Sequence, residues 1–233
     1  MKILRPASSQ SSRALQVRRP RVASMYPTSD WVDTQTRAPL FHPTALRPLH
    51  DLNRRLFDIL IDELRRSREI SPATAVLGAK LAPLGDDTLW RLARVPICWV
   101  EADFLNETAW TETGLTSRGA HALPESPLPR ARAFELAGLT YALASSIAKS
   151  SPDAACIMFG MRPAVADAFA GFSVETIHRL GQSRAHWVRP RWFDTPQDWQ
   201  RLIATAESAE ATRLPPVSLR ALNRLLVDLE PAP

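Results

Sequence analysis

The chain has 233 residues, 45% of them hydrophobic, and a formal net charge of +5 at neutral pH. This composition supports a buried core. The motifs GxGxxG and GxxxxGK followed by Ser or Thr do not occur, which excludes the common phosphate-binding loops. No apolar run approaches the roughly 20 residues of a membrane span, and the two cysteines form no CxxC pair. We therefore expect a cytoplasmic protein with reduced thiols, no membrane association, no metal site and no cofactor.

The positive charge is concentrated at the beginning of the chain. Residues 1–50 contain eight basic and two acidic residues, a balance of +6, and the rest of the chain sums to −1. Residues 1–48 are rich in proline and serine without periodicity, which predicts a disordered basic arm. Such an arm is typical of segments that find nucleic acid, although a solvated tail or a transit peptide remains open. The predicted DNA contacts in the arm are Arg5, Arg13, Arg18, Arg19 and Arg21.

The first predicted helix begins after Asp51 as its N-cap and runs to about Arg68. Ser71 and Pro72 form an N-cap and first-position pair that predicts a second, shorter helix, which Pro83 closes. The apolar stripe of the first helix is Leu52, Leu56, Leu60 and Leu64.

A third helix is expected at about 86–94, because the positive N-terminal end of a helix dipole favours two aspartates in its first turn. The stretch 97–104, ICWVEADF, predicts a short extended segment. These elements define a first unit at residues 49–112, which a turn-rich linker at 113–130 separates from a second unit at 131–205.

The second unit repeats this plan. A helix is expected at about 132–149, Pro163 opens the next, and Ser173 caps a third. Residues 187–194, WVRPRWFD, predict a second extended segment, and 196–210 another helix.

The last segment, 206–233, predicts a C-terminal amphipathic helix that Ser218 caps. Its apolar face can either dock on the protein's own core or bind a partner or a second copy of the chain. The candidate partner-binding residues are Leu219, Leu222, Leu226 and Leu229.

The two units are related by an internal repeat. Residues 81–100 align without a gap to residues 169–188 at a constant offset of 88, with six of the twenty positions identical. The identities fall at apolar helical spacings, which indicates a structural unit built twice. The identical pairs are Ala82/Ala170, Thr88/Thr176, Arg91/Arg179, Leu92/Leu180, Trp99/Trp187 and Val100/Val188.

The sequence offers few candidates for catalytic residues. The histidines are scattered, and the two that belong to the repeat, His178 and His186, correspond to Trp90 and Cys98 in the first copy. An imidazole replaced by an indole or a thiol is a poor candidate for an acid, a base or a ligand. We therefore expect a protein that is not an enzyme.

The second copy carries more basic residues in and just after its third helix than the first copy, which offers only Arg91 and Arg94 there. The first-copy counterparts of the second copy's basic residues include Glu101 and Asp103, which predicts that the second copy faces nucleic acid and the first faces protein. On this hypothesis, alanine at Arg184, Arg189 and Arg191 would lower DNA affinity without changing thermal stability. The candidate DNA contacts are Arg179, Arg184, Arg189 and Arg191.

Residues 135–194 of the second copy resemble the FlhD subunit of the flagellar master regulator and related FlhD-like regulators of conjugative elements. The resemblance rests on LTYAL (139–143), FGM (159–161), FAGFSVETIHRLGQ (169–182) and RWFD (191–194), in that order and spacing. It covers about 60 of the 233 residues.

The resemblance implies a mostly α protein of two tandem FlhD-like helical units with short extended segments, preceded by the disordered arm. It implies a DNA-binding transcriptional activator that acts in a heteromer with an FlhC-like partner subunit. Cys98 falls where FlhD has a cysteine that can bridge two subunits, so an intermolecular bridge is open. A noncatalytic protein–protein adaptor or assembly subunit is the alternative function. The double length, the arm and the final leucine helix depart from the family and leave stoichiometry and partner open.

Overall fold

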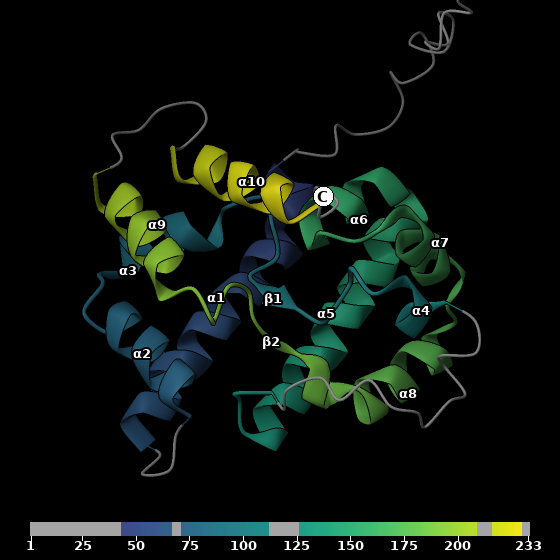
Figure 1. The fold of residues 1–233 in the computed structure, drawn as a ribbon, viewed down its shortest axis with the longest axis horizontal. Coiled ribbons are helices and arrows are strands. Elements are labelled where there is room, and N and C mark those ends of the chain that lie inside the picture. Colours follow the sequence, from purple (N-terminus) through teal and green to yellow (C-terminus); the bar gives the residue numbers. More distant parts are fainter. Residues whose placement is uncertain (1–42, 67–70, 112–125, 209–215, 230–233) are drawn as a thin grey trace, which may run out of the picture. The chain divides into compact units, whose positions relative to one another are not determined.

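The computed structural model describes residues 43–66, 71–111, 126–208 and 216–229. Within these ranges the chain forms ten α-helices and one sheet of two short strands, so the predicted mostly α fold class is confirmed (Figure 1). The first half, residues 43–111, contains α1 Pro43–Arg66, α2 Pro72–Leu81, α3 Asp86–Ala93, β1 Val100–Glu101 and α4 Glu107–Trp110. The second half, residues 126–208, contains α5 Arg130–Ser150, α6 Pro152–Phe159, α7 Pro163–Gly171, α8 Val174–Ser183, a 3-10 turn Ala185–Trp187, β2 Arg189–Pro190 and α9 Pro196–Ser208; α10 Pro216–Leu229 follows.

Helix α1 begins at Pro43, so the prediction that Asp51 caps it is wrong. The apolar stripe continues further toward the N-terminus than expected, because Leu46 and Leu49 are also buried. Proline suits the first position of a helix, where its fixed φ is already helical and its missing N–H would have no partner. Pro48 lies inside the helix and removes one hydrogen bond from an early turn.

Of the three other predicted N-caps, two are confirmed and one is wrong. Ser71 accepts a hydrogen bond from the Thr74 N–H at 3.2 Å, and Ser173 accepts one from the Thr176 N–H at 3.1 Å. Ser218 is not a cap, because α10 begins at Pro216 and the serine is buried within its first turn. A proline at the first position again starts the helix earlier than the hydroxyl signal indicates.

The two predicted extended segments pair with each other. β1 and β2 are antiparallel, with Val100 opposite Pro190 and Glu101 opposite Arg189. Only two residues of each predicted segment form a strand. Because Pro190 has no N–H, it cannot donate to the ladder, which limits the length of the pairing.

The chain leaves the two strands through turns of the same geometry. Asp103 and Trp192 both have φ of 54°. The N–H of Asn106 donates to the Asp103 carbonyl and that of Thr195 to the Trp192 carbonyl, both at 3.0 Å. A left-handed backbone is unusual for a bulky residue such as Trp192, and its recurrence after each strand shows that the two segments are built alike.

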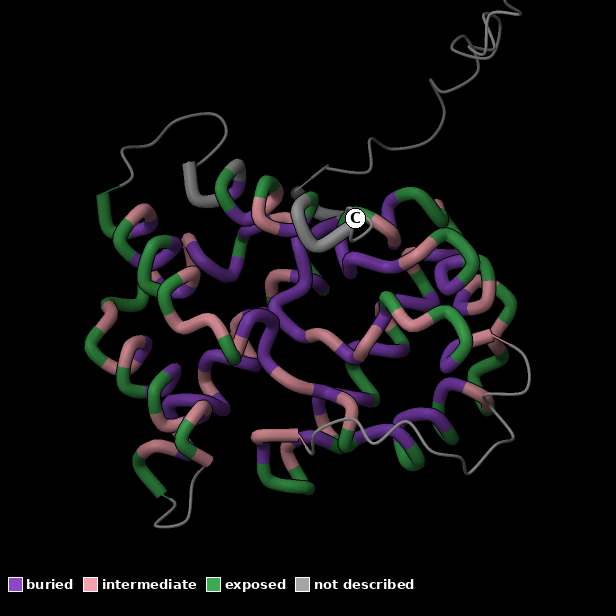
Figure 2. Tube along the Cα trace, in the orientation of Figure 1, coloured by how far each residue is buried: buried purple, intermediate pink, exposed green. Residues whose placement is uncertain are grey.

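Each half places its last helix on the other half. α4 packs against α7, whereas α9 packs against α2 and α3. Trp110 of α4 contacts the rings of Tyr141, Phe169 and Trp187, and Trp199 of α9 contacts those of Phe57 and Trp99. The buried residues, purple in Figure 2, therefore come from both halves and form one core.

Candidate nucleic-acid interface

Five of the predicted DNA contacts, Arg5, Arg13, Arg18, Arg19 and Arg21, lie outside the described residues. Their contact with DNA stays a prediction. The predicted contacts in the second half, by contrast, can each be placed.

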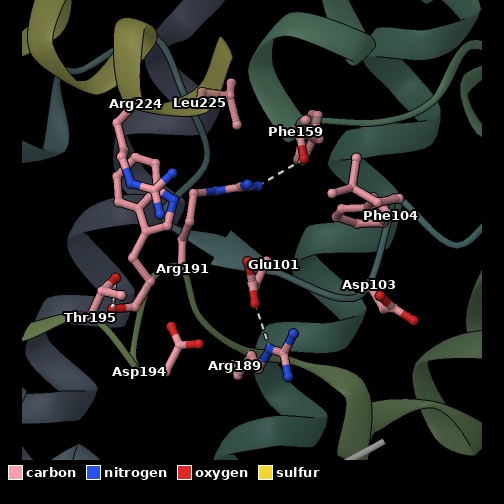
Figure 3. Close-up of a pocket in the computed structure, with 13 residues that line it drawn as sticks. Glu101, Asp103, Phe104, Phe159, Arg189, Arg191, Asp194, Thr195, Arg224 and Leu225 are labelled. Carbon is pink, nitrogen blue, oxygen red and sulfur yellow. Dashed lines mark hydrogen bonds and ion pairs between the residues drawn. The ribbon is translucent and has the colours of Figure 1, made fainter. Parts of the chain in front are cut away.

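Arg191 is buried at the junction of the halves, with 4% of its surface exposed. Its Nη2 donates to the Phe159 carbonyl at 2.8 Å (Figure 3). Its Nε donates to the Cys98 carbonyl, also at 2.8 Å. Gly160, which ends α6 with φ of 62°, leaves room for this guanidinium, because a Cβ there would lie 3.1 Å from Nη1 of Arg191. Arg191 therefore joins two backbone segments.

Arg184 is also buried, with 7% of its surface exposed. Its guanidinium carbon lies 4.9 Å from the ring centre of Trp110 and 4.3 Å from that of Trp187, and Nη1 donates to the Ala109 carbonyl at 2.6 Å. Burial lowers the pKa of Arg184 from its ordinary value. A phosphate cannot reach either buried guanidinium, so the prediction that Arg184 and Arg191 contact DNA is corrected: both arginines hold the two halves together.

Arg189 forms an ion pair with a residue on the other strand of the sheet. Its Nε lies 2.5 Å from Oε1 of Glu101 (Figure 3). Its guanidinium carbon is 5.2 Å from the ring centre of Phe193. The contrast between an arginine in one copy and an acid in the other predicts two different surfaces. In the structure these charges face each other within one interface, where they neutralise each other.

Arg179 is the one predicted contact of the second half that the described structure leaves exposed. It lies on α8, with Nη2 3.5 Å from the Thr176 hydroxyl. His178 and Gln182 on the same helix are exposed and hydrogen-bonded to each other at 2.8 Å. Arg179 therefore stays a candidate for DNA contact.

Three arginines that sequence reasoning missed converge between α9 and α10. Arg201, Arg220 and Arg224 line a groove of about 420 Å³ together with Asp198 and Leu202. In the sequence the first and last of these arginines are 23 positions apart and belong to two different predicted helices. The available signal was the spacing of four between Arg220 and Arg224, which places both on one side of a helix.

The predicted partner-binding leucines differ in their burial. Leu222 packs against the core, whereas Leu226 is 58% exposed. The side chains of Leu219 and Leu229 lie outside the described residues. Since Ala221 and Leu225 are buried, one side of α10 docks on the protein itself, and partner binding by Leu226 stays a prediction.

A second hollow, of about 470 Å³, opens at the start of α1, where the arm joins the compact part of the chain. It is lined by Arg47, His50, Asp51, Trp90 and Arg94. The Arg47 side chain is 81% exposed, and the guanidinium carbon of Arg94 lies 5.9 Å from the ring centre of Trp90. Burial, and secondarily the charge of Arg94, lower the pKa of His50. Two arginines and one carboxylate thus line this hollow.

A cavity of about 250 Å³ lies beside the strand pair (Figure 3). Arginines and carboxylates line it in equal number: Arg189, Arg191, Arg224, Glu101, Asp103 and Asp194. Because these charges cancel, the cavity does not offer the positive potential that a polyanion requires.

Cys98 is fully buried, and burial raises the pKa of its thiol to about 12. Its backbone N–H donates to the Met158 carbonyl of the other half at 2.6 Å. An intermolecular Cys98 bridge would therefore require the two halves to separate. Among the described residues, no group of three or more His, Cys, Asp or Glu could hold a metal ion, and no helix is long and apolar enough to cross a membrane.

The two thiols should react at very different rates in the native protein. Cys156 is partly exposed, whereas Cys98 is not, and only the thiolate attacks a disulfide reagent. Partial burial, and secondarily Asp153 and Asp167, raise the pKa of Cys156, so at mildly alkaline pH we expect it to react without denaturant but more slowly than a free thiol. Cys98 should react only when denaturant is added. Mass spectrometry of the labelled peptides identifies which cysteine reacted, and equally fast labelling of Cys98 would contradict its burial.

Comparisons with models of protein families, with curated proteins and with solved structures found no match to this chain.

Proposed function

We propose that this protein is a DNA-binding transcriptional regulator, an activator that acts in a cytoplasmic heteromer with an FlhC-like partner subunit and has no catalytic role. The observation that carries the proposal is the distribution of charge: residues 1–50 have a balance of +6 and the remainder −1. Polyanion binding by a protein depends mostly on such concentrated positive charge. Arg47, one of the eight basic residues of that segment, is exposed near the start of α1, and Arg94 is exposed at the end of α3.

The arrangement of the halves supports the proposal that the chain contains two tandem FlhD-like units. The starts of α3 and α8 lie 88 positions apart, and the left-handed residues Asp103 and Trp192 lie 89 apart. α4 and α9, which follow these residues, cross to the opposite halves. This reciprocal exchange is what two equivalent subunits fused into one chain would produce.

An adaptor function is the second candidate, and exposed apolar side chains favour it. Phe134 is 46%, Leu139 48% and Val174 84% exposed, all in the second half, in addition to Leu226 on α10. Exposed apolar groups of this kind commonly mark protein interfaces. They also suit the partner subunit of the proposed heteromer, so DNA binding itself separates the two candidates.

The arm can be tested in the full-length chain by replacing Arg5, Arg13, Arg18, Arg19 and Arg21 with glutamine. Removing five phosphate contacts should reduce the slope of log affinity against log salt by about 4.5 units, because each contact contributes about 0.9. Fluorescence anisotropy of labelled duplex DNA of mixed sequence, measured over a series of salt concentrations, gives this slope with and without the partner.

The matched control is a chain whose residues 1–42 keep their composition in a shuffled order. Because electrostatic attraction depends on the charges and hardly on their order, the shuffled arm should bind as the natural one does. Wild-type protein that binds no DNA, alone or with the partner, would refute the proposal and leave the adaptor function.

A further inference from the structure

The groove between α9 and α10 has a marked excess of positive charge. Arg201, Arg220 and Arg224 face one carboxylate, that of Asp198, within its lining of five residues. The lining therefore carries a net charge of +2. A groove of this kind has an electrostatic preference for an anion.

The arginines differ in how far their charge is compensated. Nε of Arg224 lies 2.8 Å from Oδ2 of Asp198, and Nη1 of Arg201 lies 3.7 Å from Oδ1 of the same residue. Nη1 of Arg220 donates to uncharged acceptors, the Thr205 hydroxyl at 2.8 Å and the Arg201 carbonyl at 3.3 Å. Asp198 is thus shared by two arginines, and the contacts that fix Arg220 leave its charge in place.

The groove is also accessible and largely preorganised. The Arg201 side chain is 72% exposed and Arg220 is exposed, so an anion can approach both from solvent. Arg220 is oriented by acceptors on α9, and Arg224 lies over the ring of Trp192, 5.7 Å from its centre. Side chains that are already oriented lose less conformational entropy when a ligand binds.

We propose that the α9–α10 groove binds the phosphodiester backbone of duplex DNA, with Arg201 and Arg220 as the phosphate contacts and Arg224 as a positioning residue tied to Asp198. A guanidinium presents a planar fork of donors that matches the oxygens of a phosphate. This inference rests on the proposed function, and it gives the compact part of the chain its own contact with the DNA that the arm attracts. Backbone contacts of this kind fix the register of a protein on the duplex.

The test compares two double variants of the full-length chain that remove the same charge. Arg201→Gln with Arg220→Gln alters the groove, whereas Arg65→Gln with Arg130→Gln alters exposed residues at the end of α1 and the start of α5. With mixed-sequence duplex DNA, the groove variant should lower the slope of log affinity against log salt by about two units, and the control variant should leave it near the wild-type value. Circular dichroism verifies that both variants are folded.

A third variant, Asp198→Asn, is expected to change affinity in the opposite direction. It removes the shared carboxylate and raises the net charge of the groove by one, so DNA affinity should increase, most clearly at low salt. A purely structural role for these residues does not predict a gain in binding.

The outcomes distinguish the groove from the proposed function. If wild-type protein binds DNA and the groove variant binds equally well with an unchanged slope, the groove proposal is refuted and the arm remains sufficient. If a polyglutamate peptide binds with the same dependence on Arg201 and Arg220 and DNA does not, the ligand is an acidic protein segment and the DNA proposal fails. If no variant binds DNA with or without the partner, both the groove and the proposed function are refuted.

Discussion

Replacing Trp110 with alanine is expected to lower the free energy of unfolding by about 3–5 kcal/mol, the usual cost of removing a large buried aromatic side chain. The indole is fully buried and donates from Nε1 to the Asp103 carbonyl at 3.0 Å. Because it packs among rings of the other half, the substitution leaves a cavity at the contact between the halves and an orphaned carbonyl beside it.

Urea denaturation followed by circular dichroism measures this loss, and Trp90→Ala serves as the control. Trp90 is half-buried, beside Arg54 and Arg94, so its replacement should cost less than about 2 kcal/mol. We expect Trp110→Ala to retain one transition, because the halves share a core. A variant in which the second half unfolds separately would show that the exchanged helices do not couple the halves.

The second large effect is expected for Arg191→Ala. The substitution removes the donors to the Cys98 and Phe159 carbonyls, and a buried carbonyl without a partner costs about 1–3 kcal/mol. The expected destabilisation is therefore about 2–6 kcal/mol, with a further contribution from the space that the side chain leaves. This result would reverse the expectation drawn from the sequence, which placed Arg191 on DNA and left stability unchanged.

The matched control is Arg179→Ala, an exposed arginine on α8 whose replacement should leave thermal stability almost unchanged. Gly160→Ala is a second variant at the same site, which adds a methyl group next to the Arg191 guanidinium. It forces a side chain into a left-handed backbone and places a Cβ 2.9 Å from Cδ1 of Leu225 and 3.1 Å from Nη1 of Arg191, so stability should also fall. Unchanged stability in both Arg191→Ala and Gly160→Ala would contradict the role of the guanidinium as a bridge between segments.

Most helices could be predicted from the sequence because their signals are local. Ser71, Pro72, Pro163 and Ser173 mark helix starts through hydrogen bonds and backbone restrictions that involve only the next few residues. The errors at α1 and α10 have one cause, since a proline upstream of the polar cap residue begins each helix earlier. A polar side chain at a suitable spacing is therefore a weaker signal than a proline followed by a continuing apolar stripe.

The arginine predictions failed where the decisive contact is distant in the sequence. Glu101 and Arg189 are 88 positions apart, and Arg191 reaches the Cys98 carbonyl across 93. The different charges of the two copies predict an exposed basic surface on the second copy. The alignment of the copies does not tell which charges meet across an interface. The groove arginines were missed for the same reason, since α9 and α10 combine them only after folding.

The sequence by itself determined the mostly helical fold class, the two extended segments, most helix starts and the concentration of positive charge in the arm. These properties depend on interactions between near neighbours and on composition, which a linear chain already contains. Only the tertiary structure decided that α4 and α9 exchange halves, that Arg184 and Arg191 are buried, and that Arg201, Arg220 and Arg224 share one groove. The physical reason is that burial and charge pairing depend on which distant segments pack together, and packing is settled by the core as a whole.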